Sequence, residues 1–202
     1  MRFFYCAFFC VALLSPSTAF PHAPGVPASR GASAAAEKIS VSGISNVGKV
    51  SDALFRGAQP HLSSLDELKK LGITTIIDLR GEAHDFRDHE QARAEALGIH
   101  FVSIPLGGFS TPTDAQLAEF FALLRQTPTP KIFIHCQFGA DRTGVFIAAY
   151  RIAFQHWSSA DALAEMHRFG FHSHWHPGMI TYVRALPVLL QSDATLKAAL
   201  LN

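Results

Sequence analysis

Apolar residues are grouped along most of the chain, either in short β-branched or aromatic runs or in longer segments with helical spacing. The runs that fit buried strands lie at residues 73–77, 99–104 and 131–135, and residues 39–50 have room for one or two more. The segments that fit helices lie at residues 63–71, 89–97, 111–124, 143–156 and 158–170, before a helical C-terminal part that we expect to break near Pro187. Strands that alternate with helices predict an α/β fold with a central, mainly parallel sheet flanked by helices.

Two boundaries of these elements are marked by particular residues. The strand over residues 73–77 is expected to stop within Asp78-Leu79-Arg80-Gly81. Thr111 is expected to cap the following helix, with Pro112 in the first turn and Asp114 at the third helical position.

The N-terminal residues have the layout of a secretory signal peptide. Arg2 is the only Lys, Arg, Asp or Glu before Arg30, residues 3–14 are apolar, and Ser-Thr-Ala at 17–19 resembles a cleavage site. The apolar stretch is shorter than the roughly 20 residues that cross a membrane, so we expect residues 1–19 to be removed, which would leave no membrane span. An uncleaved anchor and a plain buried segment are the alternatives. The prediction is an exported protein, either periplasmic or secreted.

The composition after this segment divides the chain into a linker and a domain. Residues 20–40 are rich in Pro, Ala, Gly and Ser and predict a flexible linker, which places the folded domain at residues 41–202. The formal net charge is +1, and there is no long basic run. We therefore expect no nucleic-acid partner, although a neutral chain can still form a local site for an anionic ligand.

Removal of the signal peptide would leave a single thiol. Cys6 and Cys10 lie within residues 1–19, and Cys136 is the one cysteine that follows. A lone thiol in an exported protein is unusual, because that compartment oxidises thiols. Counting alone favours an inert buried cysteine, so the neighbours of Cys136 decide its interpretation.

The residues around Cys136 predict an anion site between a strand and a helix. In such a loop the backbone N–H groups and the helix dipole form a nest for an anion. Gly139 permits a backbone conformation that a Cβ would strain, and Gly144 lets the first helical turn pack closely. Arg142 supplies a bidentate partner for phosphate oxygens, and the same positive field favours the nucleophilic thiolate of Cys136. The expected phosphate contacts are Gln137, Phe138, Gly139, Ala140, Asp141, Arg142 and Thr143.

This segment resembles the signature of the protein tyrosine and dual-specificity phosphatases, which is His-Cys, five residues, then Arg-Ser/Thr. His135-Cys136 and Arg142-Thr143 match it, and residues 54–60 and 72–80 resemble the compact atypical dual-specificity branch. The resemblance implies a phosphatase fold and a phosphocysteine intermediate, with Cys136 as nucleophile and Arg142 as phosphate clamp. It also implies that Thr143 assists release of the thiolate and that His135 orients the loop.

The general acid is less clear, because the Trp-Pro-Asp tripeptide of the larger tyrosine phosphatases is absent. Asp141 is the first candidate, since the resemblance assigns an acid role to an Asp directly before the Arg. Its alternative role is to brace the loop. Asp114 is the second candidate, and its alternative role is that of a first-turn helix acid. Another group or the substrate itself remains open.

The sequence thus predicts a phosphomonoester hydrolase without metal or cofactor, acting on a phosphorylated protein or a small phosphorylated molecule. An inositol-phosphate or phosphoinositide phosphatase is the nearest alternative. A pseudophosphatase that only binds phosphate ligands and a rhodanese-type sulfurtransferase are more distant ones.

Several further polar residues have mainly structural interpretations. Arg80 is expected to form an ion pair, whereas Arg56 and Arg80 could both reach an anionic substrate. A histidine cluster around Trp175 is expected to form a solvated rim rather than a metal site. Its members are His167, His172, His174 and His176.

Overall fold

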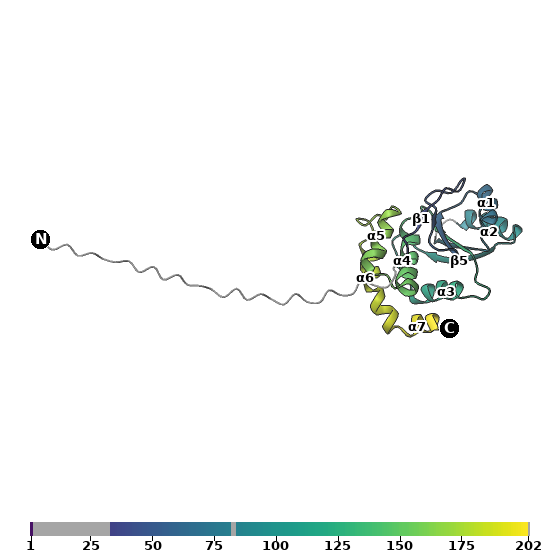
Figure 1. Cartoon of the computed structure of the whole chain (residues 1–202). Helices are drawn as coiled ribbons and strands as arrows, with labels where there is room; N and C mark the ends of the chain where they lie inside the picture. The colour runs from purple at the N-terminus through teal and green to yellow at the C-terminus, as the bar shows by residue number, and fades with distance from the viewer. Residues whose placement is uncertain (2–32, 82–83, 202) are drawn as a thin grey trace. The chain divides into compact units, whose positions relative to one another are not determined.

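The computed structural model describes residue 1, residues 33–81 and residues 84–201 (Figure 1). Apart from Met1, the predicted signal peptide lies outside the described residues, as does the predicted linker up to residue 32.

A sheet of six strands forms the centre of the fold in the order β1-β2-β3-β6-β4-β5. The three strands β3, β6 and β4 and the edge strand β5 run parallel, while β1 and β2 add an antiparallel extension. The strands are β1 (Glu37–Lys38), β2 (Gly48–Lys49), β3 (Leu54–Ala58), β4 (Thr75–Arg80), β5 (His100–Leu106) and β6 (Ile132–Cys136). This arrangement confirms the predicted mainly parallel sheet.

Helices cover both faces of the sheet (Figure 1). They are α1 (Leu65–Lys70), which follows the short 3-10 helix η1 (Leu62–Ser64), α2 (His84–Ala96), α3 (Asp114–Leu124), α4 (Asp141–Gln155), α5 (Ser159–Arg168), α6 (Pro177–Ser192) and α7 (Ala194–Leu201). Alternate residues of β6 supply the two cores. Ile132 and Ile134 join the larger core under α3 to α7, and Phe133 joins the smaller core under α1 and α2. Burial on both faces explains why β6 is a continuous apolar run.

Two predicted boundaries were wrong, and a third agrees with the structure. The β4 strand ends at Arg80, within the expected stop segment, and includes Asp78 and Arg80 because both side chains find buried ionic partners. Thr113, not Thr111, caps α3, since its side chain accepts the Gln116 N–H in a capping box. Helix α6 passes through Pro187 without a break.

The folded part begins before the predicted boundary at residue 41. Ser33 Oγ donates to Gln155 Oε1 at 2.6 Å, and the Ala36 N–H donates to Glu165 Oε1 at 2.6 Å. Residues 37–38 then pair with β2. The composition of residues 33–40 resembles a linker, yet these backbone contacts tie them to the domain.

Candidate active site

Cys136 lies at the carboxyl end of β6, the strand that β3 and β4 flank. Its side chain is buried, and the four residues of the loop that follows lead directly into α4. The carboxyl ends of parallel strands are the usual place for a ligand site in such sheets. The structure therefore places the predicted phosphate loop, residues 136–142, at the position that the sequence indicated.

Gly139 fixes the shape of this loop by packing against the backbone of β3. Its φ is +66°, and a Cβ at this position would lie 2.3 Å from the carbonyl carbon of Gly57 and 2.5 Å from the nitrogen of Ala58. No side chain fits into that space, so the glycine is required both for conformation and for contact.

Arg56 and Asn46 hold the outer side of the loop. Arg56 Nη2 donates to the Gly139 carbonyl at 2.7 Å, and Asn46 Nδ2 lies 3.2 Å from the carbonyl oxygens of both Phe138 and Gly139. The N–H and C=O of one peptide point in opposite directions. Carbonyls tied to the outside therefore leave the loop amides facing inward, as an anion nest requires.

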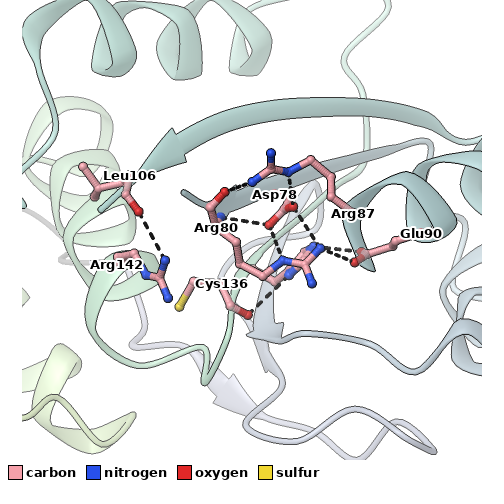
Figure 2. A network of polar contacts seen from close by, with 8 residues as sticks. Asp78, Arg80, Arg87, Glu90, Leu106, Cys136 and Arg142 are labelled. Carbon is pink, nitrogen blue, oxygen red and sulfur yellow. Dashed lines mark hydrogen bonds and ion pairs between the residues drawn. The ribbon is translucent and has the colours of Figure 1, made fainter. Parts of the chain in front are cut away.

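Arg142 lies in the first turn of α4 and is only 7% exposed. Its Nη1 donates to the carbonyl of Leu106 at 3.2 Å, which anchors the side chain to the end of β5. Figure 2 shows the guanidinium and the Cys136 sulfur pointing toward one another. The predicted clamp and the predicted nucleophile thus face a common space.

A buried ionic network supports the loop from the other side (Figure 2). Arg80 binds Asp78 through Nε and Nη2 at 2.8 and 2.9 Å, and its Nη2 also binds Glu90 at 2.7 Å. Arg87 adds a contact to Asp78 at 3.1 Å. Burial raises the pKa of Asp78, but hydrogen bonds from Arg80 outweigh it and hold that pKa below its usual value. The network confirms the ion pair expected for Arg80.

His135 joins this network to the loop. Its Nε2 lies 2.9 Å from Glu90 Oε1, and its Nδ1 lies 3.4 Å from the carbonyl of Cys136. Burial lowers the pKa of His135, but the charge of Glu90 dominates in combination with Asp78, so the pKa is raised. The side chain that precedes the cysteine is consequently fixed at both ring nitrogens.

Thr143 is fully buried in the first turn of α4. Among the described residues its Oγ1 has no hydrogen-bond partner. A hydroxyl in this state can donate to an atom that enters the site.

The two candidate acids have different surroundings. Asp141 begins α4, and its carboxylate accepts the His172 N–H at 2.8 Å while the His172 and His176 rings lie 3.2 and 3.7 Å away. Asp114 begins α3 next to its cap Thr113. The structure places Asp141 in the phosphate loop and Asp114 at a helix end after β5.

Asn46 and Glu90 complete the site and were missed by the sequence analysis. Asn46 has a φ of +55°, and Glu90 lies 1% exposed in α2. An Asn in a turn and a Glu in a polar helix carry no signal that distinguishes them from surface residues. Their roles come from contacts with segments 45 to 93 residues away in sequence.

The histidine cluster does not form a metal centre within the described ranges. No group of three or more His, Cys, Asp or Glu side chains there is placed to hold an ion. His172 instead stacks on Trp175 with ring centroids 5.7 Å apart.

Comparison with known proteins shows the family to which the chain belongs. Residues 34–175 match the family described as DSP-PTPase phosphatase fused to NAD+ kinase. The chain belongs to this phosphatase family. The rhodanese alternative loses its basis with this match.

The chain is also similar to proteins with curated names and solved structures. The dual specificity protein phosphatase TpbA of Pseudomonas aeruginosa is 32% identical over 131 residues, which are 62% of this chain and 55% of TpbA. The chain thus spans little more than half of that relative. A crystal structure of TpbA matches with a TM-score of 0.63 at 25% identity, over 78% of this chain and 97% of the other. TpbA has also been solved as a cysteine-to-serine variant with phosphotyrosine.

A second solved phosphatase extends the likeness in fold. The catalytic domain of Siw14 from S. cerevisiae, a PP-IP phosphatase, has a TM-score of 0.61 at 20% identity, over 78% of this chain and 98% of the other. At that identity the match concerns the fold alone. The predicted phosphatase-type α/β architecture is confirmed.

Proposed function

We propose that this chain is a phosphomonoester hydrolase of the dual-specificity protein phosphatase type that works through a phosphocysteine. One observation carries the proposal. The buried Cys136 sulfur and the Arg142 guanidinium face one another beneath a loop whose carbonyls are tied to the outside (Figure 2). This arrangement can hold three phosphate oxygens and present a sulfur nucleophile to phosphorus.

The reaction proceeds in two steps. The Cys136 thiolate attacks phosphorus, the bond from phosphorus to the ester oxygen breaks, and the leaving oxygen takes a proton from a general acid. Water then attacks the phosphocysteine and gives its proton to the conjugate base. The S–P bond breaks to release phosphate, and the buried Thr143 hydroxyl donates to the departing sulfur. Arg142 and the loop amides stabilise the equatorial oxygens in both steps.

Asp141 is the proposed acid, since it adjoins Arg142 and is the carboxylate within the loop. Its contacts with His172 and His176 place two imidazole groups beside it, at 3.2 and 3.7 Å. Asp114 is assigned the structural role of a first-turn acid in α3.

The substrate assignment follows the family and its named members. A phosphorylated protein fits the names of the TpbA relatives, and TpbA has been solved with phosphotyrosine. A small phosphate such as an inositol phosphate is the alternative, and the cavity described in the next subsection favours it. Both Cys136 and Arg142 are present, so nothing in the loop supports a pseudophosphatase.

Export is a separate part of the proposal. It rests on the apolar residues 3–14 and on the Ser-Thr-Ala at 17–19. None of the helices that the structure describes is long and apolar enough to cross a membrane. N-terminal sequencing of protein secreted or released from the periplasm is expected to begin at Phe20. A start at Met1 in that material would contradict cleavage.

The central experiment measures hydrolysis of p-nitrophenyl phosphate by the purified protein with reductant and a chelator. Cys136→Ser is expected to abolish turnover, because an alcohol replaces the thiolate, while its far-UV circular dichroism stays unchanged. Rapid quenching and peptide mass spectrometry of the wild type should locate phosphate on Cys136. Turnover by Cys136→Ser at the wild-type rate would overturn the proposal.

A matched pair of variants identifies the acid. Asp141→Asn is expected to lower kcat for alkyl phosphates about 100-fold, and to affect p-nitrophenyl phosphate far less because that leaving group needs little protonation. Asp114→Asn is expected to change neither rate by more than about twofold, since its charge acts on a helix end. The reverse pattern would assign the acid to Asp114.

A further inference from the structure

A cavity of about 610 Å³ opens beside the phosphate loop. Two loop residues, Phe138 and Ala140, form one wall of it, and the end of α5 with the segment that follows forms the other. The cavity therefore lies directly against the phosphate loop. The residues that line it are Lys38, Asn46, Phe138, Ala140, His167, Arg168, Phe169, Gly170, His172 and Trp175.

The charged side chains in this lining have one sign. Lys38 and Arg168 are cationic, and no Asp or Glu is among the lining residues. The buried Glu165 binds Arg151 at 2.7 Å, and Asp141 contacts the lining residue His172 through its backbone N–H and its ring. Lys38 and Arg168 therefore give the lining residues a net positive charge, with Asp141 adjacent to them.

A stack of two cations on one ring joins the cavity to the phosphate loop. Lys38 Nζ lies 5.2 Å from the centroid of the Phe169 ring, and the Arg56 guanidinium carbon lies 4.1 Å from it. Arg56 also donates to the Gly139 carbonyl. Phe169 lines the cavity, so a ligand in the cavity would lie close to the ring that Arg56 contacts.

Two exposed aromatic side chains border this cavity. Phe138 is 67% exposed and Trp175 is 70% exposed, and Trp175 stacks on His172. Exposed rings of this size mark a contact surface. Between them they offer apolar faces against which a carbon ring can lie while its anionic groups meet the cations.

We propose that this cavity binds a second phosphate group of the substrate. The inference rests on the proposed phosphatase function and narrows it. The preferred substrate is then a small carbon ring with at least two phosphates, one held over Cys136 and another held by Lys38 and Arg168. A phosphate carries close to two negative charges, which the two cations match better than a single peptide carboxylate would. The volume lies within the range of small-molecule sites.

The test compares substrates within one assay. The kcat/KM of the wild type for a myo-inositol bisphosphate is divided by its kcat/KM for p-nitrophenyl phosphate. Lys38→Met and Arg168→Met are each expected to lower this ratio about tenfold, since each removes a charge-assisted contact with the second phosphate. Lys197→Met, which removes an equally exposed cation on α7, is expected to leave the ratio unchanged.

The outcomes separate the inference from the function. If the wild type fails to hydrolyse p-nitrophenyl phosphate, the proposed function is overturned. If it hydrolyses that compound and neither variant moves the ratio, the second subsite is overturned and the function stands. If the two variants lower kcat/KM only for an acidic tyrosine-phosphorylated peptide, the cavity is assigned to protein substrates instead. That result also overturns the proposal.

A second arm identifies the source of the ligand. The same bisphosphate headgroup is offered free and as a phosphoinositide in detergent micelles, and equal effects of both variants on the two forms show that the headgroup alone is recognised. A direct readout uses Cys136→Ser, in which addition of the bisphosphate is expected to change Trp175 fluorescence. Trp175→Phe in that background removes the change. A signal that persists without Trp175 would contradict binding at this cavity.

Discussion

Two fully buried arginines flank the strand that carries Cys136, and their surroundings are opposite. Arg80 in β4 binds the carboxylates of Asp78 and Glu90. Arg56 in β3 has backbone carbonyls and the Phe169 ring as its neighbours. Burial lowers the pKa of both, yet Asp78 reverses this for Arg80, whereas the pKa of Arg56 falls to about 10. At that value Arg56 still carries its charge at neutral pH.

The two arginines show that buried charge is balanced in different ways on the two sides of β6. On the β4 side cations and anions compensate one another, so the network stabilises the end of β4 without attracting a ligand. On the β3 side Arg56 forms no ion pair among the described residues, although the charge of Glu165 favours its protonated form, and it lies against the phosphate loop. Burial of this arginine costs free energy, but its positive charge lies next to the site that binds an anion.

The largest effect is expected from breaking the balanced side. Arg80→Met removes the cation that the buried carboxylates of Asp78 and Glu90 share, which costs about 3–5 kcal/mol of unfolding free energy. Urea denaturation measures the loss. The matched control is Arg93→Met, because Arg93 in α2 forms an exposed ion pair with Asp66 and should contribute less than about 1 kcal/mol. Equal losses in the two variants would remove the distinction between buried and exposed pairs.

A smaller stability effect is expected on the β3 side. Arg56→Met removes a hydrogen bond to Gly139 and a cation–π contact but leaves no carboxylate unpaired, so we expect a loss of about 1–2 kcal/mol. The kcat/KM for p-nitrophenyl phosphate should fall about tenfold, because the loop loses an outer support. Arg56→Lys keeps the charge and separates the electrostatic part from the geometric part. A stability loss as large as that of Arg80→Met would contradict the comparison.

The smallest effect is a dependence on pH that passes through His135. Because its folded pKa is raised, its contribution to stability is complete below the ordinary value of 6.5 and is lost as the pH rises through the folded pKa. The unfolding free energy of the wild type minus that of His135→Asn should therefore decrease above pH 6.5. Urea titrations at several pH values measure it, and a difference that grows with pH would show that the imidazole is neutral in the network.

The loop and its flanking elements could be predicted because their signals are local. A β-branched run, a cysteine, two glycines and an arginine lie within one short segment, and each restricts the same strand-to-helix turn. The ion pair of Arg80 was also predictable from its Asp78 neighbour. Features that depend on contacts within one short segment could therefore be predicted from the sequence.

Contacts between distant segments were not accessible. Glu90 in α2 contacts His135 in β6, and the backbone of Ala36 contacts Glu165 in α5, although the neighbours of Ala36 resemble a linker. Pro187 predicted a break, but packing of Leu186 and Leu190 into the larger core stabilises α6 through it. Tertiary contacts decided each of these cases.

The close contact of Gly139 with Gly57 has a consequence for how this loop can vary. Main-chain atoms of β3 set the shape of the loop, while the side chains of Gln137 and Phe138 are exposed. Substrate recognition and the shape of the reactive loop thereby depend on different atoms of the same loop. Substitutions of Gln137 and Phe138 can therefore change substrate selectivity without changing the loop shape that β3 sets.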